Sequence, residues 1–125
     1  MKVFLHHIYE YRKGLRNLVL FTGAAEQRQF MEAKLRKCGI DYLVCPVGQT
    51  RVNVFFGNAA CVDVVRRIGC ENLSSLSPEH DFMLGIMLGY DRIKQCDRYL
   101  QRARAGGEPP RSTPQEAPFV ERMIA

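Results

Sequence analysis

The chain has 125 residues, of which 46% are hydrophobic and 25% charged, values that suit one globular domain of ordinary size. No apolar run reaches the roughly 18 residues that a membrane-spanning helix needs, and the first residues are too polar for a signal peptide, so we expect a cytoplasmic protein outside the membrane. The net charge of +5 favours an acidic partner, which could be a protein, a nucleic acid or a phosphorylated ligand.

Five cysteines are spread along the sequence without C-x-x-C spacing. An odd number without a motif is typical of reduced intracellular thiols rather than of a disulfide framework or a zinc site. We therefore predict free thiols in or near the core at Cys38, Cys45, Cys61, Cys70 and Cys96.

Residues 2–13 are predicted to form a short helix that ends at Gly14. Apolar residues recur there at helical spacing, although residues 3–5 could also begin a strand. Glycine is the usual residue just past a helix, and Arg12 and Lys13 suit the negative end of the helix dipole.

The next segments predict alternating strands and helices. An unbroken apolar run in residues 15–21 indicates a strand covered on both faces, and therefore central in its sheet. Residues 24–38 follow as a helix. Its expected inner positions are Phe30, Met31 and Leu35.

Residues 41–47 and 51–56 predict a hairpin joined by a short turn, and residues 59–68 predict another short helix. Pro46 cannot donate a ladder hydrogen bond, so we expect it in an edge strand or at a bulge.

A long helix is predicted from Pro78 to about residue 105, because Ser77 offers an N-cap and proline favours the first helical position. Its first half is apolar nearly all round, and its second half is amphipathic. The positions expected to face inward in the second half are Ile93, Cys96 and Leu100.

Residues 106–125 are expected to be a disordered tail, because proline, glycine and polar residues dominate them. Residues 119–124 are apolar again, and the sequence leaves open whether they are a short docking motif or a chance terminus.

Together these elements predict a single α/β domain over residues 1–105. The expected architecture is a two-layer sandwich, with a small three- or four-stranded mixed sheet, helices mainly on one face and a long C-terminal helix. Residues 15–68 are arranged like most of a ferredoxin-like fold without its last strand, which is an analogy of shape alone.

Three motifs occur in order: HHIYEYRKGLR at residues 6–16, NVFFG at 53–57 and LSPE through LGYDR at 76–92. In these motifs the chain resembles the uncharacterised bacterial family DUF2023 over roughly residues 2–102. The resemblance implies a small α/β bacterial protein with no assigned activity and no established catalytic residues. It also implies flavodoxin as a partner, since family members tend to be encoded beside flavodoxin and flavodoxins are acidic.

A dense cluster of polar and aromatic side chains lies in residues 6–16. His6 and Glu10 are four residues apart, so on a helix they share a face, as two metal ligands or a base and its orienting group would. A metal site needs three or four ligands, and no spacing signal supplies the others. We therefore assign no catalytic residue, no metal ligand and no cofactor. A small enzyme or metal-binding protein centred on His6, His7 and Glu10 remains the alternative.

The same cluster fits a recognition patch, because Tyr and Arg are over-represented among interface hot spots. The competing interpretation is an ordinary amphipathic helix with half-buried tyrosines. The predicted partner-binding residues are His6, His7, Tyr9, Glu10, Tyr11, Arg12, Lys13 and Arg16.

Gly85 and Gly89 lie one turn apart in an apolar segment. Each glycine costs about 1 kcal/mol against alanine in a helix, so a structural reason is expected. We predict close helix packing there, with a homodimer seam and then a ligand slot as the other interpretations.

No phosphate-binding glycine motif or nucleophile pattern is present. Nucleic-acid binding would depend on scattered cations without a known module and is the weakest hypothesis. The leading hypothesis is a non-enzymatic interaction module for an acidic protein, plausibly flavodoxin.

Overall fold

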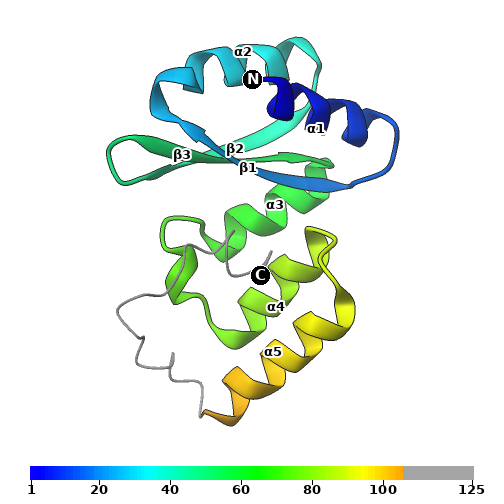
Figure 1. Ribbon diagram of the computed structural model, residues 1–125, viewed down its shortest axis with the longest axis vertical. Coiled ribbons are helices and arrows are strands. Elements are labelled where there is room, and N and C mark those ends of the chain that lie inside the picture. Colours follow the sequence, from blue (N-terminus) through cyan, green and yellow to red (C-terminus); the bar gives the residue numbers. More distant parts are fainter. Residues whose placement is uncertain (106–125) are drawn as a thin grey trace. The chain divides into compact units, whose positions relative to one another are not determined.

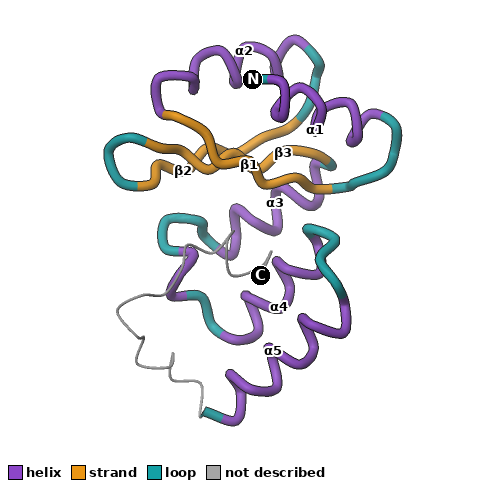
Figure 2. The backbone as a smooth tube through the Cα atoms, viewed as in Figure 1, coloured by secondary structure: helices purple, strands orange, loops and turns teal. Residues whose placement is uncertain are grey.

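The computed structural model describes residues 1–105, which divide into two compact units (Figure 1). The first unit covers Met1–Glu71 and contains a sheet, and the second begins at Asn72 and is helical, as the colouring of Figure 2 shows. The predictions for residues 106–125 lie outside the described residues. That residues 1–105 form a single globular domain stays a prediction.

Three strands form the sheet: β1 (Leu18–Ala24), β2 (Asp41–Val47) and β3 (Arg51–Gly57). Their order is β1-β3-β2, and both neighbouring pairs are antiparallel. The β2–β3 hairpin is confirmed, and Pro46 lies in the edge strand β2. The apolar run expected at the centre of the sheet belongs to β1, which is also an edge strand, so that expectation was wrong. The central strand is β3, which is buried along almost its whole length.

α1 (Lys2–Arg12) and α2 (Arg28–Lys37) lie on one face of the sheet (Figure 1). Their inner side chains and those of the strands pack into one core, where the Phe4 ring lies edge-on to that of Phe56 at a centroid distance of 5.7 Å. The core residues are Phe4, Ile8, Val19, Met31, Leu35, Ile40, Val52, Val54 and Phe56.

The end of α1 follows the sequence prediction. Gly14 takes a φ of 79°, its N–H donates to the carbonyl of Tyr11, and the N–H of Leu15 donates to the carbonyl of Glu10. This pair of bonds satisfies carbonyls that a helix end otherwise leaves free.

The start of α2 differs from the prediction. β1 runs on to Ala24, a short 3-10 turn covers Ala25–Gln27, and only then does the helix begin. Phe30 was expected on the inner face but is 47% exposed. The buried face of the helix is the one that Met31 and Leu35 share, four residues apart, and the neighbouring position 30 points away from it.

α3 (Ala59–Ile68) lies against β2 and β3 on the other face of the sheet (Figure 1). Its N-terminus is capped by Asn58, whose Oδ1 accepts from the N–H of Ala60 at 2.9 Å, and Val62 and Val65 are its buried residues. The α/β class with a three-stranded sheet and a C-terminal helix is confirmed. The sheet is antiparallel throughout rather than mixed, because β1 and β2 both pair with β3.

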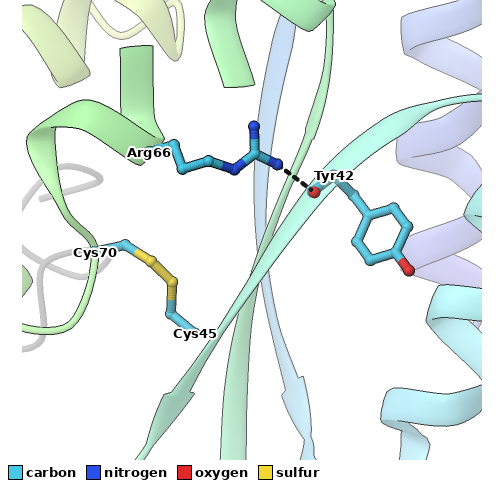
Figure 3. The surroundings of a disulfide bond; sticks show 4 residues. All are labelled: Tyr42, Cys45, Arg66 and Cys70. Carbon is cyan, nitrogen blue, oxygen red and sulfur yellow. Dashed lines mark hydrogen bonds between the residues drawn. A yellow bond between two sulfur atoms is a disulfide. The ribbon is translucent and has the colours of Figure 1, made fainter. Parts of the chain in front are cut away.

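A disulfide joins Cys45 of β2 to Cys70, just after α3 (Figure 3). The two Cα atoms are 6.2 Å apart. The prediction of five free thiols was therefore wrong for these two residues, because the fold brings together cysteines that are 25 positions apart in sequence. Cys38, Cys61 and Cys96 are free and half-buried.

The second unit contains a 3-10 turn (Leu73–Ser75) and two helices, α4 (Pro78–Met87) and α5 (Arg92–Arg104). The single long helix was therefore a wrong prediction. The chain leaves α4 at Gly89, which has a φ of 80°, and Asp91 caps α5 by accepting a hydrogen bond from its first turn.

The apolar stripe of α5 was expected to face inward but is largely open. Ile93 is 66% exposed and Leu100 is 47% exposed, whereas Cys96 between them is half-buried. The polar residue Gln95, at 4% exposure, is the buried one in this helix.

Candidate functional site

α1 presents outward side chains on two sides, because Phe4 and Ile8 occupy its buried face. On one side His7 lies beside β1, with its ring centroid 6.1 Å from that of Phe21. On the other side Tyr9 faces a groove shared with α2. The predicted recognition patch is therefore divided between two surfaces.

His7, Glu10 and Arg16 form a polar cluster on the β1 side of α1. Nδ1 of His7 lies 3.0 Å from Oε1 of Glu10 and 3.2 Å from Nη1 of Arg16. A guanidinium can only donate a hydrogen bond, and a carboxylate can only accept one. Nδ1 must carry a proton to donate to Glu10 and must lack one to accept from Arg16, so only one of the two contacts is a hydrogen bond in a given tautomer.

Glu10 has a pKa lowered from its ordinary value of 4.5. The hydrogen bond with His7 is the largest cause, desolvation opposes it, and the positive charge of Arg16 lowers the pKa further. Glu10 is consequently an ionised acceptor at neutral pH and has no proton to give to a substrate.

His6, Tyr9 and Lys13 make a stacked column on the exposed face of α1. The rings of His6 and Tyr9 are 6.1 Å apart at an interplanar angle of 22°, and Lys13 Nζ lies 5.5 Å from the centroid of the Tyr9 ring. These contacts are stacking and cation–π interactions on the surface. The expected pairing of His6 with Glu10 across one turn is replaced by the hydrogen bond that Glu10 accepts from His7.

A groove of about 510 Å³ runs between α1 and α2. Arg12, Lys13 and Lys34 carry its positive charge, and Leu5 and Ile8 are among its apolar lining residues. Arg12 Nη1 also lies 3.9 Å from the sulfur of Cys38. We call this feature the α1–α2 groove, and its full lining is Leu5, Ile8, Tyr9, Arg12, Lys13, Lys34 and Cys38.

Three of the eight predicted partner-binding residues, Tyr9, Arg12 and Lys13, line the α1–α2 groove. Tyr11 instead packs partly against the core. The sequence prediction missed Lys34 and Cys38 of the α2 end, although their four-residue spacing places both on one side of a helix and was a signal that could have found them.

Gly85 and Gly89 have different environments. A Cβ atom at Gly85 would collide with Oε1 of the buried Gln95, so α4 and α5 approach closely there. Gly89 lies past the end of α4 at positive φ, and a Cβ there would meet open space.

Two other cations, Arg36 and Arg66, have polar partners outside the α1–α2 groove. Arg66 pairs with Asp63 at 2.7 Å, and Arg36 donates to the hydroxyl of Tyr42 at 2.9 Å. Both border a separate polar pocket of about 410 Å³ at the end of α2. The basic groups considered for nucleic-acid binding are thus partly neutralised by neighbours.

The described residues offer neither a metal site nor a membrane span. Within residues 1–105, no three His, Cys, Asp or Glu side chains are arranged to hold a metal ion. No helix in the same range is long and apolar enough to cross a bilayer.

A search of the curated proteins found no match. The model of one family, described as a protein of unknown function (DUF2023), matches residues 2–102. That span starts with α1 and ends inside α5, so it contains the α1–α2 groove and the three motifs noted in the sequence. The chain belongs to the DUF2023 family of proteins of unknown function.

Proposed function

We propose that this protein is a non-enzymatic interaction module that docks an acidic protein in the α1–α2 groove. The observation that carries the proposal is the placement of three cations, Arg12, Lys13 and Lys34, around a floor that includes Leu5 and Ile8. Such a surface matches a partner that presents carboxylates around an apolar side chain.

The neighbouring polar cluster of His7, Glu10 and Arg16 supports binding of a ligand rather than its chemical conversion. The Glu10 carboxylate is occupied by His7, and the same ring nitrogen is within reach of Arg16. None of these three side chains lines the α1–α2 groove. A substrate in that groove would therefore meet cations, a phenol and the thiol of Cys38, but neither the His7 ring nor the Glu10 carboxylate.

The partner proposed is flavodoxin in a bacterial cytoplasm. The support for it is the family's association with flavodoxin together with the charge of the two proteins, since this chain is basic at +5 and flavodoxins are acidic. Complementary charge would speed the encounter and make the affinity fall steeply with salt.

A titration against flavodoxin at low ionic strength tests this proposal. The variant Arg12→Glu/Lys34→Glu should weaken binding by at least about tenfold, because it reverses two charges that line the groove. The matched control Arg67→Glu/Lys94→Glu changes the net charge equally at two exposed positions outside the groove. If both variants weaken flavodoxin binding equally, docking in the α1–α2 groove is contradicted. If the unaltered protein does not bind flavodoxin, flavodoxin as the partner is contradicted.

The cytoplasmic part of the proposal has its own test. Disulfides are rare in that compartment, so Cys45 and Cys70 should be reduced when thiols are alkylated at the moment of lysis. Protein that is oxidised throughout would contradict a cytoplasmic location.

The hydrogen bond between His7 and Glu10 favours one second candidate, an acid–base centre at these two residues. A metal-binding version would also need His6, whereas no three such side chains are arranged to hold a metal ion within residues 1–105. Elemental analysis of the purified protein, with and without the change His6→Ala, tests its metal version. A stoichiometric metal lost in the variant would support that candidate over the docking module.

A further inference from the structure

The hydrogen bonds at the two ends of β1 show which of its backbone groups face away from the sheet. Before the strand, the carbonyl of Asn17 accepts from the N–H of Asn58, and after it the N–H of Ala25 donates to the carbonyl of Thr50. Residues of an antiparallel strand direct these groups alternately toward and away from one neighbour. The odd-numbered residues of β1 therefore bond to β3, and the even-numbered ones face outward. The outward residues are Leu18, Leu20, Thr22 and Ala24.

This outer edge of β1 is open over its second half. β1 has β3 as its one neighbour in the sheet, so the outward N–H and C=O groups have no ladder partner within residues 1–105. Leu18 is 0% exposed and Leu20 is 8% exposed, whereas residues 21–24 are half-buried. The accessible part of the edge therefore runs from Leu20 to Ala24.

The opposite edge of the sheet, along β2, is protected. The odd-numbered residues of β2 bond to β3, so Tyr42, Val44 and Pro46 face outward there. Pro46 has no N–H to offer, and the carbonyl of Tyr42 accepts from Nη2 of Arg66 at 3.4 Å (Figure 3). Proline and charged side chains are common means of preventing an edge strand from pairing with another chain. β1 has neither, since its sequence is LVLFTGA.

A second copy of β1 matches the open edge. In an antiparallel pair centred on Thr22, this residue lies opposite Thr22 of the second copy, and Leu20 lies opposite Ala24 of the second copy. Each pair joins residues whose N–H and C=O groups face outward, so both hydrogen bonds of every pair can form. Phe21 then lies opposite Gly23 of the second copy, which leaves room for its ring. Although the chain has a net charge of +5, β1 is uncharged, so no like charges oppose each other in the strand pair.

We propose that the protein forms a two-fold symmetric homodimer in which residues 20–24 of two copies pair as antiparallel strands. The two sheets become one continuous sheet with the order β2-β3-β1-β1-β3-β2. The two-fold axis of such a pair is perpendicular to the sheet, so α1 and α2 of both copies lie on the same face. The dimer thus presents two α1–α2 grooves on one face.

Thr22→Pro tests the hydrogen bonds of the edge. It removes the outward N–H from both copies, and Pro46 already occupies an outward position in the other edge strand. Sedimentation equilibrium of the full chain should show a dimer whose dissociation constant rises at least about tenfold in Thr22→Pro. Thr22→Val is the matched control, because it loses the same hydroxyl, which donates to Asn53 at 2.6 Å, but keeps the N–H. A monomer at every concentration, or equal dissociation constants for the two variants, would overturn the proposal.

Cysteine cross-linking tests the register without a proline. Directly opposite, hydrogen-bonded residues have Cα atoms about 5.5 Å apart, a separation that a disulfide can bridge. In a Cys38→Ser/Cys61→Ser/Cys96→Ser background, Thr22→Cys should therefore give a covalent dimer on treatment with diamide.

Ala24→Cys in the same background is the control for this experiment. Position 24 lies two residues from the axis in each copy, so the two substituted positions are about 13 Å apart and should not cross-link. Equal cross-linking of Thr22→Cys and Ala24→Cys would overturn the register. No cross-link from Thr22→Cys would overturn pairing through β1.

Discussion

Asp81 in α4 accepts two hydrogen bonds from Arg98 in α5, from Nε at 2.7 Å and from Nη2 at 3.1 Å, although its side chain is only 1% exposed. Arg102 Nη1 lies 3.2 Å from the same carboxylate, and Arg102 Nη2 donates to the carbonyl of Leu76 at 2.9 Å. This buried carboxylate with two guanidinium partners joins the two helices of the second unit.

Removing that carboxylate should destabilise the second unit. Asp81→Ala leaves Arg98 and Arg102 without a counter-ion in a buried site, which typically costs about 3–5 kcal/mol. Urea unfolding followed by circular dichroism would measure the loss. The exposed Asp97 on α5 provides the control, and Asp97→Ala should change stability by less than about 0.5 kcal/mol.

Glu10 should make the free energy of unfolding depend on pH in the acidic range. Its folded-state pKa is lowered, so its contribution is present above the unfolded value near 4.5 and is lost as the pH falls through the folded value. His7→Ala removes the largest cause of the lowering, so the pKa of Glu10 should rise toward its ordinary value. Carbon-detected nuclear magnetic resonance of the Glu10 carboxyl would follow this titration. His6→Ala should move it less, because His6 acts only through its charge.

The Cys45–Cys70 bond closes a loop of 25 positions, for which a chain-entropy estimate gives about 3.5 kcal/mol of stabilisation. Cys45→Ser/Cys70→Ser should therefore unfold at a lower urea concentration than the oxidised protein. Cys61→Ser removes a free thiol from α3 and is the matched control. The same midpoint for the double variant and the oxidised protein would contradict a stabilising role of the bond.

Gly85 should resist substitution in spite of its helical position. Gly85→Ala would gain about 1 kcal/mol of helix propensity, but the new methyl would displace the buried side chain of Gln95, and overpacking costs about 1–3 kcal/mol. In a Gln95→Ala background the same change should become neutral or stabilising. A double-mutant cycle of unfolding free energies measures the coupling, and additive effects would rule out the close contact.

Local signals in the sequence predicted the elements that depend on nearby residues. The helix at residues 2–13 has its apolar spacing and its terminating Gly14, and the structure ends α1 with the bonds that such a glycine makes. The hairpin of β2 and β3 was likewise confirmed, because alternating apolar residues and a short turn define it locally.

Features that depend on residues far apart in the sequence could not be predicted from local patterns. Pairing of Cys45 with Cys70 requires the position of β2 relative to the end of α3, which no spacing reveals. The α1–α2 groove brings Lys34 and Arg12 into one lining, and that arrangement arises from two helices sharing one face of the sheet. The break after α4 was hidden because a glycine such as Gly89 is tolerated inside many helices and ends others.

The position of Cys70 has a mechanical consequence. It is the penultimate residue of the first unit, so a pulling force applied through the second unit enters the first almost directly at this sulfur. The covalent bond then carries the tension to Cys45 in β2, so the covalent path bypasses the intervening residues 46–69, which contain β3 and α3. For as long as the bond is intact, β3 receives load only sideways, through the hydrogen bonds that join it to its neighbouring strands.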